Sequence, residues 1–391
     1  MKIIIGSESF NPNISGVAIS TELLAENLSQ LGYEVFVFSP SINYKTYWEK
    51  YKNFQILRIK SLPNPFRKGF RVTALPKKDI AHAVQVINPD VIHLQDPTSI
   101  CMQLKAIARR KKIPLVITHH FSLDYIISFL KYLRPFHPLI KKILMAYLIK
   151  FYNSVDELIC PTDTVKKDLS KWDIKIPITT ISNGVDLERF FSYASPIYIR
   201  SKFHLPTNPI VLYLGRIDQD KSIEVLIKAI PKVIKETDAH FLIVGSGNKL
   251  ASIRKMAEKM GIMRVIHFLG NVDHDSRDLV EIYQISKVFA IPSAIETQSI
   301  VTLEAMAAGL PIVAANGGAL PELVKNGENG FLFEPGNSDL MAKFIIKILK
   351  DKKLNSKMKK KSLEIIAGHE LSKCIEKIIK VYEKVIQKNH R

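Results

Sequence analysis

The chain has 391 residues, which suits two domains better than one, and its 47% hydrophobic content is that of a folded globular protein. A net charge of +19 indicates an anionic partner: nucleic acid, an anionic membrane face or a phosphorylated substrate. No window holds the roughly 18–20 uninterrupted apolar residues of a membrane-spanning helix, and the N-terminal apolar run is too short for a signal peptide. The three cysteines lack the spacing of a zinc site or a disulfide framework. We therefore expect a soluble or peripheral cytoplasmic protein with reduced thiols.

Short β-branched or aromatic runs alternate with helical patterns along the chain. The strands expected in the first half are 2–6, 34–38, 54–59, 91–95, 114–118, 157–160 and 178–181. Those expected in the second half are 210–214, 240–245, 265–269, 287–291, 311–314 and 330–333. Such alternation predicts an α/β protein whose halves are each a doubly wound, parallel, Rossmann-like sheet. Ligands of these folds bind at the carboxyl ends of the strands, so both halves are expected to face a central cleft.

The predicted domain limits follow the change in pattern along the chain. The N-terminal domain is expected at 1–187 and the C-terminal domain at 208–370. Between them, 188–207 contains prolines and lacks strong periodicity, which is typical of a linker. The Lys-rich C-terminal region is helical, and a last helix at 371–391 is expected to pack back toward the N-terminal domain.

Two features of the first half follow predicted strands. Gly16 stands in the loop GSESFNPNISGV, just before a helical pattern, where a glycine lets the backbone approach a phosphate or a sugar. A plain strand-to-helix loop is an equally good interpretation. His119 and His120 follow strand 114–118, where a histidine could donate a hydrogen bond to a sugar hydroxyl, and a structural histidine is the alternative.

The stretch LYLGRIDQDKS (212–222) predicts an anion site. A strand ends at Gly215, and Arg216 and Lys221 follow beside a helix start, an arrangement suited to a diphosphate. Ordinary surface cations are the alternative. The stretch also contains an Asp-x-Asp pattern at 218–220, and a second copy lies at 273–275. Some sugar-nucleotide enzymes hold a divalent metal with this pattern, but two chance copies favour solvated loop acids, so no metal site is expected.

The stretch IVGSGNKL (243–250) follows another strand and supplies Gly245 and Gly247. Leu250 stands where the dinucleotide fingerprint has its third glycine, and no acidic residue ends the next strand. A nicotinamide site is therefore not expected, whereas a position of Gly245 near a nucleotide base is.

The stretch SAIETQSIVTLEAMAAGLP (293–311) predicts a helix that is apolar at nearly every position from Ile300 to Ala308, and therefore buried. Glu304 nevertheless lies in its middle, and Glu296 precedes its start. Backbone N–H groups at a helix start lack intrahelical partners, so carboxylates and free donors are expected side by side.

In this order along nearly the whole chain, these stretches resemble the retaining GT-B glycosyltransferases of family four. The matching pieces are NISGV, THH (118–120), NGVD (183–186), GRIDQDK (215–221), GSG (245–247) and residues 292–324. The last is specific, because Glu296 and Glu304 match the family's E-x7-E pair. Two positions depart from the family: Ser299 stands where it often has glycine, and Ser15 precedes Gly16 where many members have a second glycine.

The resemblance implies a role for each candidate residue. Glu304 would bind the ribose of a sugar nucleotide, and Glu296 would meet the donor sugar. The backbone N–H groups of Gln298, Ser299 and Ile300 would face the sugar and the diphosphate. The remaining candidates are two cations that neutralise the departing diphosphate, a histidine near the sugar and a glycine in the closing loop: Arg216, Lys221, His120 and Gly16. His120, Glu296, Arg216 and Lys221 are the catalytic candidates, and neither a cofactor nor a metal is expected.

A basic and aromatic segment predicts the acceptor. Residues 101–152 carry ten Lys and Arg against one acid, Asp124. Within them, 125–152 is typical of helices in a membrane interface, broken near Pro135 and Pro138. The expected contacts are Phe129, Lys131, Arg134, Lys141, Lys142 and Lys150. An amphipathic helix pair of the domain core is the alternative, and 63–71 could be a second, looped contact.

The segments THHFSLDY and ETQS resemble those of bacterial diacylglycerol glucosyltransferases. This implies an enzyme that transfers glucose from UDP-glucose to 1,2-diacylglycerol. We expect the enzyme on the inner face of the cell membrane, where anionic lipid attracts its basic segment. A mannosyltransferase that uses GDP-mannose on phosphatidylinositol or a polysaccharide precursor is the main alternative. A sugar-nucleotide epimerase would need acids and bases in the cleft of the first half, and a nucleic-acid-binding protein would need a reading element; neither is identifiable from the sequence.

Overall fold

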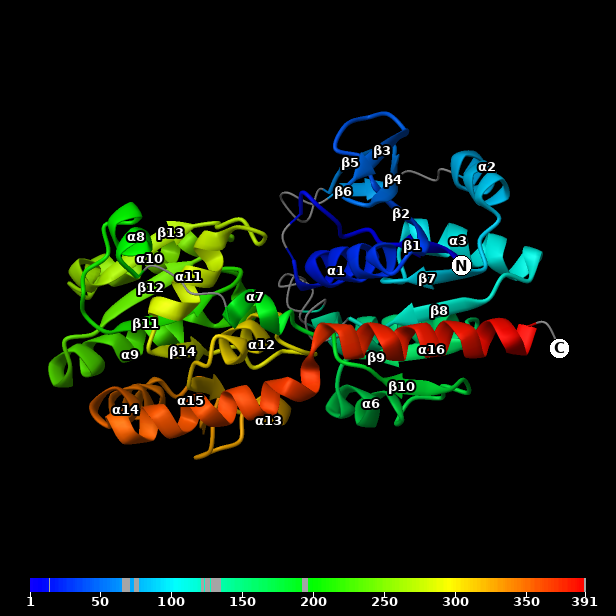
Figure 1. Ribbon diagram of the computed structural model, residues 1–391. Coiled ribbons are helices and arrows are strands. Elements are labelled where there is room, and N and C mark those ends of the chain that lie inside the picture. The colour runs from blue at the N-terminus through cyan, green and yellow to red at the C-terminus, as the bar shows by residue number, and fades with distance from the viewer. Residues whose placement is uncertain are drawn as a thin grey trace. The chain divides into compact units, whose positions relative to one another are not determined.

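The structure is a computed structural model that describes residues 1–13, 15–64, 71–73, 77–120, 123, 127, 135–191 and 196–389. The chain forms two compact units (Figure 1). Unit 1 comprises Met1–Asn183 and Ser372–Arg391, and unit 2 comprises Gly184–Leu371. The first division thus falls after Asn183, compared with the predicted boundary after residue 187.

Unit 1 is built on an eight-stranded sheet, as far as the structure describes it, in the order β10-β9-β8-β7-β1-β2-β4-β3. Its strands are β1 (Lys2–Gly6), β2 (Glu34–Pro40), β3 (Tyr47–Tyr51), β4 (Phe54–Ile59), β7 (Val91–Leu94), β8 (Leu115–Thr118), β9 (Glu157–Cys160) and β10 (Ile178–Thr180). All neighbours pair in parallel except β3, which is antiparallel to β4. The strands predicted in this half are confirmed, each to within two residues.

Three further strands lie outside the prediction: β3 and the short antiparallel pair β5 (Ser61–Pro63) and β6 (Arg71–Thr73). Along β3, exposed residues alternate with partly buried ones, as in a strand with one wet face. The other two have three residues each, too few for a hydrophobic run to reveal.

The helices of unit 1 are α1 (Gly16–Gln30), α2 (Lys77–Ile87), α3 (Ser99–Lys111), α5 (His137–Tyr152), α6 (Asp163–Leu169) and α16 (Leu371–Asn389). The C-terminal helix α16 lies along the sheet of this unit (Figure 1), where the Tyr382 hydroxyl is 2.7 Å from His93 Nδ1 and Lys384 Nζ is 2.7 Å from Glu157 Oε2. Since both contacts are to strands of unit 1, the last helix belongs to this unit's core. No helix in the described ranges is both long enough and apolar enough to cross a bilayer.

Unit 2 contains a six-stranded parallel sheet in the order β13-β12-β11-β14-β15-β16. Its strands are β11 (Ile210–Leu214), β12 (His240–Val244), β13 (Ile266–Gly270), β14 (Val288–Ile291), β15 (Ile312–Ala315) and β16 (Gly330–Phe333), which confirms all six predicted strands. Its helices are α7 (Leu187–Phe191), α8 (Pro196–Lys202), α9 (Ile223–Glu236), α10 (Leu250–Lys259), α11 (Arg277–Ile285), α12 (Ile300–Ala307), α13 (Leu320–Leu323), α14 (Ser338–Lys350) and α15 (Lys352–Ile366). Buried apolar clusters cover both faces of the sheet, which is the predicted doubly wound architecture.

The segment predicted as a linker, 188–207, is instead part of unit 2. It contains most of α7 and all of α8, and Phe190, Ile199 and Leu205 are buried in the unit's core. Pro196 misled the prediction, because it begins α8, where a missing N–H group costs nothing. Asp186 Oδ1 accepts a hydrogen bond from Arg189 N at 3.1 Å, at the start of α7.

The strand orders fix where each unit can bind a ligand. In unit 1, β1 lies between β2 and β7, and in unit 2, β11 lies between β12 and β14. The chain connections on the two sides of β1, and of β11, therefore run in opposite directions. In doubly wound folds ligands bind at the carboxyl ends of the strands at such a point. In unit 2 the loops that follow β11 and β14 begin at Gly215 and Pro292, and they contain Arg216, Lys221, Glu296, Gln298 and Ser299.

Candidate active site

The loops after β11 and β14 are joined by an ion pair. Lys221 Nζ lies 2.6 Å from Glu296 Oε1 and 3.7 Å from Asp220 Oδ2. The hydroxyl of Ser293 also lies 3.2 Å from the carbonyl oxygen of Asp220. The structure thus brings together Lys221 and Glu296, which are 75 residues apart in the sequence.

Arg216 is held by two aspartates of its own loop. Its Nη1 pairs with Asp218 Oδ2, and its Nη2 donates to Asp220 Oδ2 at 2.7 Å. Both aspartates are buried, so the prediction of solvated acids at 218–220 is wrong. The Arg216 guanidinium pairs with both carboxylates and so offsets the desolvation cost of burying them. The Asp-x-Asp pattern alone does not reveal this partner. Asp273 and Asp275 are exposed, as predicted.

The predicted cations are therefore part of a charged network. Arg216 and Lys221 together face three carboxylates, those of Asp218, Asp220 and Glu296. A diphosphate at this edge would have to take these cations from their carboxylates. The network is therefore suited to hold the two cations in place until an anion of higher charge competes for them.

Two glycines that the sequence analysis did not single out shape the loop of Glu296. A Cβ atom on Gly317 would lie 2.7 Å from Ala294 O, and one on Gly318 would lie 2.4 Å from Glu296 O. Gly318 also has a φ of +53°, a conformation that favours glycine. Ala319 N then donates to Glu296 O at 2.8 Å. The sequence signal is the Gly-Gly pair directly before α13.

Helix α12 begins with its N-terminal amides uncapped by a side chain. Ser299 is the N-cap residue, but its hydroxyl accepts a 2.8 Å hydrogen bond from Thr302 Oγ1 instead of capping the helix. Gln298 and Ile300 are buried beside it. Since the amides of a helix start carry the positive end of its dipole, this end of α12 suits a negatively charged group.

Glu304 lies one turn into α12, is buried, and is held at both oxygens. Oε1 is 2.7 Å from His274 Nε2, and Oε2 accepts a 2.7 Å hydrogen bond from the Tyr283 hydroxyl. Burial alone lowers the pKa of His274, but hydrogen bonds to Asp275 and Glu304 outweigh it and raise the pKa to about 9. Each carboxylate oxygen has two lone pairs, so Glu304 retains capacity to accept further hydrogen bonds. The sequence analysis did not identify His274 or Tyr283 as its partners.

Gly245 and Gly247 have a packing role. Gly245 has a φ of +130°, and a Cβ atom there would lie 2.0 Å from Gly215 O, while one on Gly247 would lie 2.4 Å from Ile217 O. The loop after β12 is thus pressed against the loop that carries Arg216. A place for Gly245 near a nucleotide base stays a prediction.

In unit 1, the two adjacent histidines have different surroundings. His119 is buried, with Nδ1 2.7 Å from the Tyr152 hydroxyl and its ring edge-on to Trp172. His120 Nε2 lies 2.9 Å from Gln95 Oε1, and burial, followed by the neighbouring His119, lowers the pKa of His120 to about 3. His119 is therefore a core residue, and His120 is a neutral imidazole at the carboxyl ends of β7 and β8.

The loop after β1 is anchored by serine and carboxylate side chains. Ser15 caps α1 by accepting from Ala18 N at 3.1 Å, and its hydroxyl lies 2.6 Å from that of Ser9, which gives the departure from Gly-Gly a structural role. Gly16 begins the helix. Glu8 and Asp96, which the sequence analysis missed, hold this loop to the start of α3: Glu8 N donates to Asp96 at 2.6 Å, and Ile100 N to Glu8 at 3.3 Å. Burial raises the pKa of both carboxyl groups.

The basic segment is described only in part. Phe129, Lys131 and Arg134 lie outside the described residues, as do most residues of 63–71, whereas α5 carries Lys141, Lys142 and Lys150, all exposed. This helix begins near Pro138 and contains no acidic residue. One of its faces exposes large apolar side chains: Phe136, Leu139, Ile143 and Tyr147. We call this face, with its lysines, the α5 face.

Two family models match the chain. The model described as "Glycosyltransferase Family 4" matches residues 14–189, and that described as "Glycosyl transferases group 1" matches residues 196–364. The alpha-monoglucosyldiacylglycerol synthase of Acholeplasma laidlawii is 31% identical over 88% of this chain and 87% of its own length. The chain belongs to the group 1, or family 4, glycosyltransferases.

Other relatives of this glycosyltransferase differ in their printed activities. The synthase of the same name from Streptococcus pneumoniae is 28% identical over 87% of this chain and 76% of its own length. A GDP-mannose-dependent phosphatidylinositol monomannoside mannosyltransferase of Mycobacterium tuberculosis is 32% identical over 43% of this chain and 46% of its own length.

Solved structures confirm the GT-B fold. Sucrose-phosphate synthase from Thermosynechococcus elongatus has a TM-score of 0.79 at 20% identity and covers 99% of both chains. HepE of Anabaena, solved in complex with UDP-glucose, has a TM-score of 0.75 at 18% identity and covers 98% of this chain and 100% of its own. At these identities the likeness concerns the fold alone.

Proposed function

We propose that this glycosyltransferase retains anomeric configuration and moves glucose from UDP-glucose to 1,2-diacylglycerol at the inner face of the cell membrane. One observation carries the donor side: Glu304, fixed by Tyr283 and His274, lies one turn inside α12, and Glu296, in the loop that leads into this helix, is paired with Lys221. The two relatives named as alpha-monoglucosyldiacylglycerol synthases, which match 87% and 88% of this chain, support the acceptor. The glucosyl group in the names of these two relatives supports a glucose donor.

In this proposal Glu304 accepts hydrogen bonds from the ribose hydroxyls with its remaining lone pairs. Because Tyr283 and His274 already fix the carboxylate, little ordering is left to occur on binding, which favours affinity. Glu296, Gln298, Ser299 and Ile300 line the donor sugar and its diphosphate. Gly245 and Gly16 allow backbone to lie close to the nucleotide.

The leaving group is a nucleoside diphosphate, which is stable as an anion and needs no proton. Arg216 and Lys221 exchange carboxylate partners for diphosphate oxygens, and the α12 amides stabilise the charge that develops as the glycosidic bond breaks. These groups are preorganised by the loop network, so we propose that no metal or cofactor is required. For retention, the acceptor hydroxyl attacks from the face that the diphosphate leaves.

His120 contributes as a neutral hydrogen-bonding group near the sugar. Its low pKa, about 3, keeps the imidazole uncharged at neutral pH, so it does not act as a counter-ion. Gln95 fixes one ring nitrogen at 2.9 Å and therefore orients the ring.

We propose that the α5 face contacts an anionic membrane. Its exposed apolar side chains recur at helical spacing from Phe136 to Tyr147, and Lys141, Lys142 and Lys150 flank them without any acid on the helix. Such a surface gains free energy from apolar burial and about 1 kcal/mol per cation near anionic lipid.

A GDP-mannose-dependent enzyme acting on phosphatidylinositol or a polysaccharide precursor is the second candidate. The mycobacterial relative supports it over 43% of this chain. The same carboxylates and cations suit the ribose and the diphosphate of GDP-mannose.

In the test, purified protein is incubated with labelled UDP-glucose or labelled GDP-mannose and with vesicles that contain diacylglycerol or phosphatidylinositol. Each reaction is run with and without anionic lipid, and with and without EDTA. The expected product is glucosyldiacylglycerol, formed faster with anionic lipid and equally fast with EDTA. Mannosylated phosphatidylinositol would favour the second candidate. No lipid product with either donor would refute both, and a loss of activity with EDTA would refute the metal-free mechanism.

A further inference from the structure

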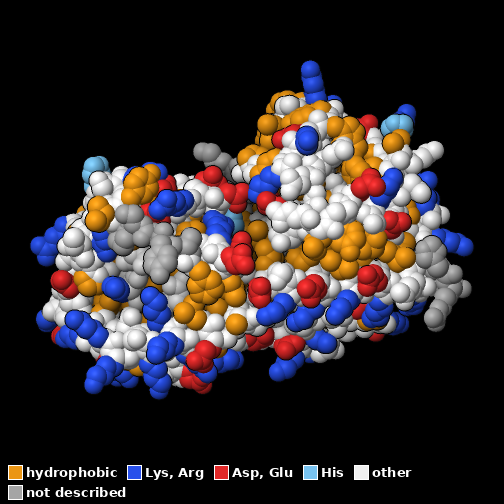
Figure 2. Space-filling model, in the orientation of Figure 1, with side chains coloured by type: hydrophobic (Ala, Val, Ile, Leu, Met, Phe, Trp, Pro, Cys, Tyr) orange, Lys and Arg blue, Asp and Glu red, His pale blue; other side chains and the backbone are white. Residues whose placement is uncertain are grey.

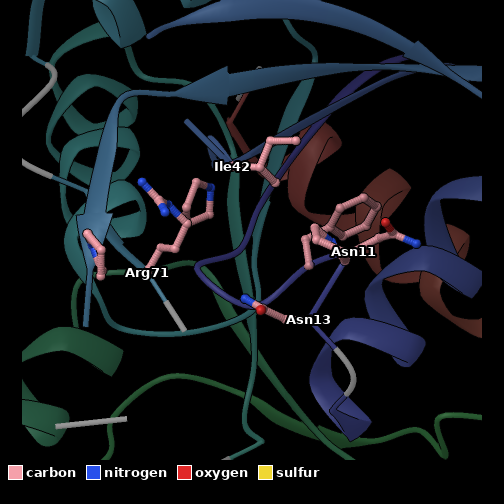
Figure 3. Close-up of a pocket in the computed structure, with 8 residues that line it drawn as sticks. Asn11, Asn13, Ile42 and Arg71 are labelled. Carbon is pink, nitrogen blue, oxygen red and sulfur yellow. The ribbon is translucent and has the colours of Figure 1, made fainter. Parts of the chain in front are cut away.

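Unit 1 contains a pocket of about 330 Å³ between the β1–α1 loop and the β5–β6 pair. The residues that line it are Phe10, Asn11, Pro12, Asn13, Pro40, Ile42, Pro63 and Arg71. Figure 3 shows Ile42 and Asn13 on opposite sides of this space and Arg71 across from Asn11. The volume lies at the lower end of that of small-molecule sites, about 300–1,000 Å³.

One wall of the pocket is fixed before any ligand arrives. Arg58 Nη1 donates to Asn11 O at 2.6 Å, and its guanidinium stacks 5.7 Å from the centre of the Phe10 ring. Asn11 Nδ2 donates to the Tyr51 hydroxyl at 2.9 Å. Since Phe10 is buried and the loop is tied to β3 and β4, this wall keeps its shape.

Arg71 supplies a cation at the opposite wall. Its Nε donates to Ser61 Oγ at 2.7 Å, its Nη2 to Ser61 O at 2.8 Å, and its guanidinium lies 5.5 Å from the centre of the Tyr44 ring. Among the described residues, none accepts a hydrogen bond from Nη1. Arg71 is thus oriented by Ser61 and retains donors for a carbonyl or another acceptor in the pocket.

The surface beside the pocket carries exposed apolar side chains. Ile42 is 56% exposed and Tyr44 59%. Leu62, 49% exposed, and Val72, 40% exposed, are paired on the face of the β5–β6 pair opposite to that of Pro63 and Arg71. Figure 2 shows hydrophobic side chains gathered over the end of unit 1 that carries β3 and β5. Lys45 and Lys60 are exposed near them. A monomeric surface rarely groups such side chains unless it meets a partner or a membrane.

We propose that this pocket binds the glycerol-ester end of the lipid acceptor, with the exposed apolar side chains beside it, Ile42, Tyr44, Leu62 and Val72, in the membrane surface. Five of the eight lining residues are apolar and match acyl methylene groups. Arg71 donates to an ester carbonyl, and the amide of Asn13 binds a glycerol hydroxyl. A water-soluble sugar acceptor would leave the apolar wall, and the exposed apolar side chains beside the pocket, without an apolar partner. The inference rests on the proposed lipid acceptor.

The test uses the full chain and dioctanoylglycerol, with and without a diazirine on one acyl chain. After irradiation, the label is expected on peptides that contain residues 10–13, 40–44 or 61–63. For transfer from UDP-glucose, Ile42→Ser and Arg71→Gln are expected to raise KM for dioctanoylglycerol about tenfold, equivalent to one lost contact of about 1.4 kcal/mol, with KM for UDP-glucose unchanged.

Leu31→Ser and Val86→Ser are matched controls, because both residues are exposed and lie in unit 1 away from the pocket. They are expected to leave both KM values unchanged. Labelling confined to other peptides, or an unchanged acceptor KM in both pocket variants, would overturn the inference while leaving the glucosyltransferase activity standing. If the wild type glucosylates no lipid, the proposed function fails, and labelling of the pocket peptides by dioctanoylglycerol still decides whether this is a lipid site.

Discussion

Glu304 Oε1 lies 2.7 Å from His274 Nε2, so the glutamate expected to bind ribose is already paired with a side chain from the loop after β13. The Tyr283 hydroxyl occupies the other oxygen at 2.7 Å. A buried carboxylate is costly unless its oxygens are satisfied, and these two partners allow Glu304 to lie in an otherwise apolar helix. The donor site therefore includes residues that support the expected nucleotide contact.

Removing the carboxylate is expected to abolish most nucleotide affinity. Glu304→Ala should weaken UDP binding roughly 10–100-fold, the loss of charge-assisted hydrogen bonds of about 1.5–3 kcal/mol. Tyr283→Phe, which removes one supporting hydroxyl, should weaken it about threefold to tenfold. Isothermal titration calorimetry measures both. The exposed Glu334→Ala serves as the control, and unchanged affinity in Glu304→Ala would show that this residue does not bind the nucleotide.

His274 is expected to titrate near pH 9, well above an ordinary histidine. Since its folded-state pKa is raised, the stabilisation from its pairing is fully present below pH 6.5 and is lost as the pH rises through about 9. NMR of protein labelled at histidine Cε1 reports the titration, with His274→Asn to assign the signal. A midpoint near 6.5 would mean that the pair with Glu304 does not hold in solution.

Gly318 is expected to be required for the Glu296 loop. In Gly318→Ala the new methyl group meets Glu296 O at 2.4 Å, so we expect about 1–3 kcal/mol of destabilisation and a large fall in kcat/KM. Gly336→Ala is the matched control, because Gly336 also has a positive φ, +85°, but has nothing within 4 Å of the added atom. Thermal unfolding and donor kinetics compare the two variants. Equal losses of stability and of kcat/KM in the two variants would show that backbone strain, and not contact with Glu296, causes the effect.

The α5 face is expected to act in membrane binding only. Lys141→Ala combined with Lys142→Ala should weaken binding to anionic vesicles about tenfold or more, since each cation contributes about 1 kcal/mol near the surface. UDP affinity should not change. Lys352→Ala with Lys353→Ala, an exposed pair on α15, is the control in a sedimentation assay. An equal loss of vesicle binding in the control pair would show that overall charge is responsible.

The sequence predicted the parallel sheets well, because buried strands such as β14 and β15 are short apolar runs between turn residues. It did not reveal β5 and β6, which have three residues each and depend on pairing with each other. It also misassigned 188–207, where Phe190 and Ile199 become core residues only when α7 and α8 pack in unit 2. A local sequence pattern does not show burial that depends on residues far apart in the chain.

The candidate site was predictable to a similar extent. The spacing of Glu296 and Glu304 is a local pattern, so it could be read directly. The burial of Asp220 depends on Arg216, and the place of Glu304 depends on His274, 30 residues away. The polar pair Gln95–His120 likewise forms only when β7 and β8 lie side by side. Residue type and position predict candidates, but partners come from the fold.

The most direct test of the central claim is the structure of the product. Purified protein is incubated with UDP-glucose labelled with carbon-13 at C1 and with vesicles of diacylglycerol and anionic lipid, and the lipid product is examined by NMR. We expect an α-linked glucosyldiacylglycerol, with the configuration of the donor retained. A β-linked product, or labelled glucose recovered only in water-soluble material, would contradict it.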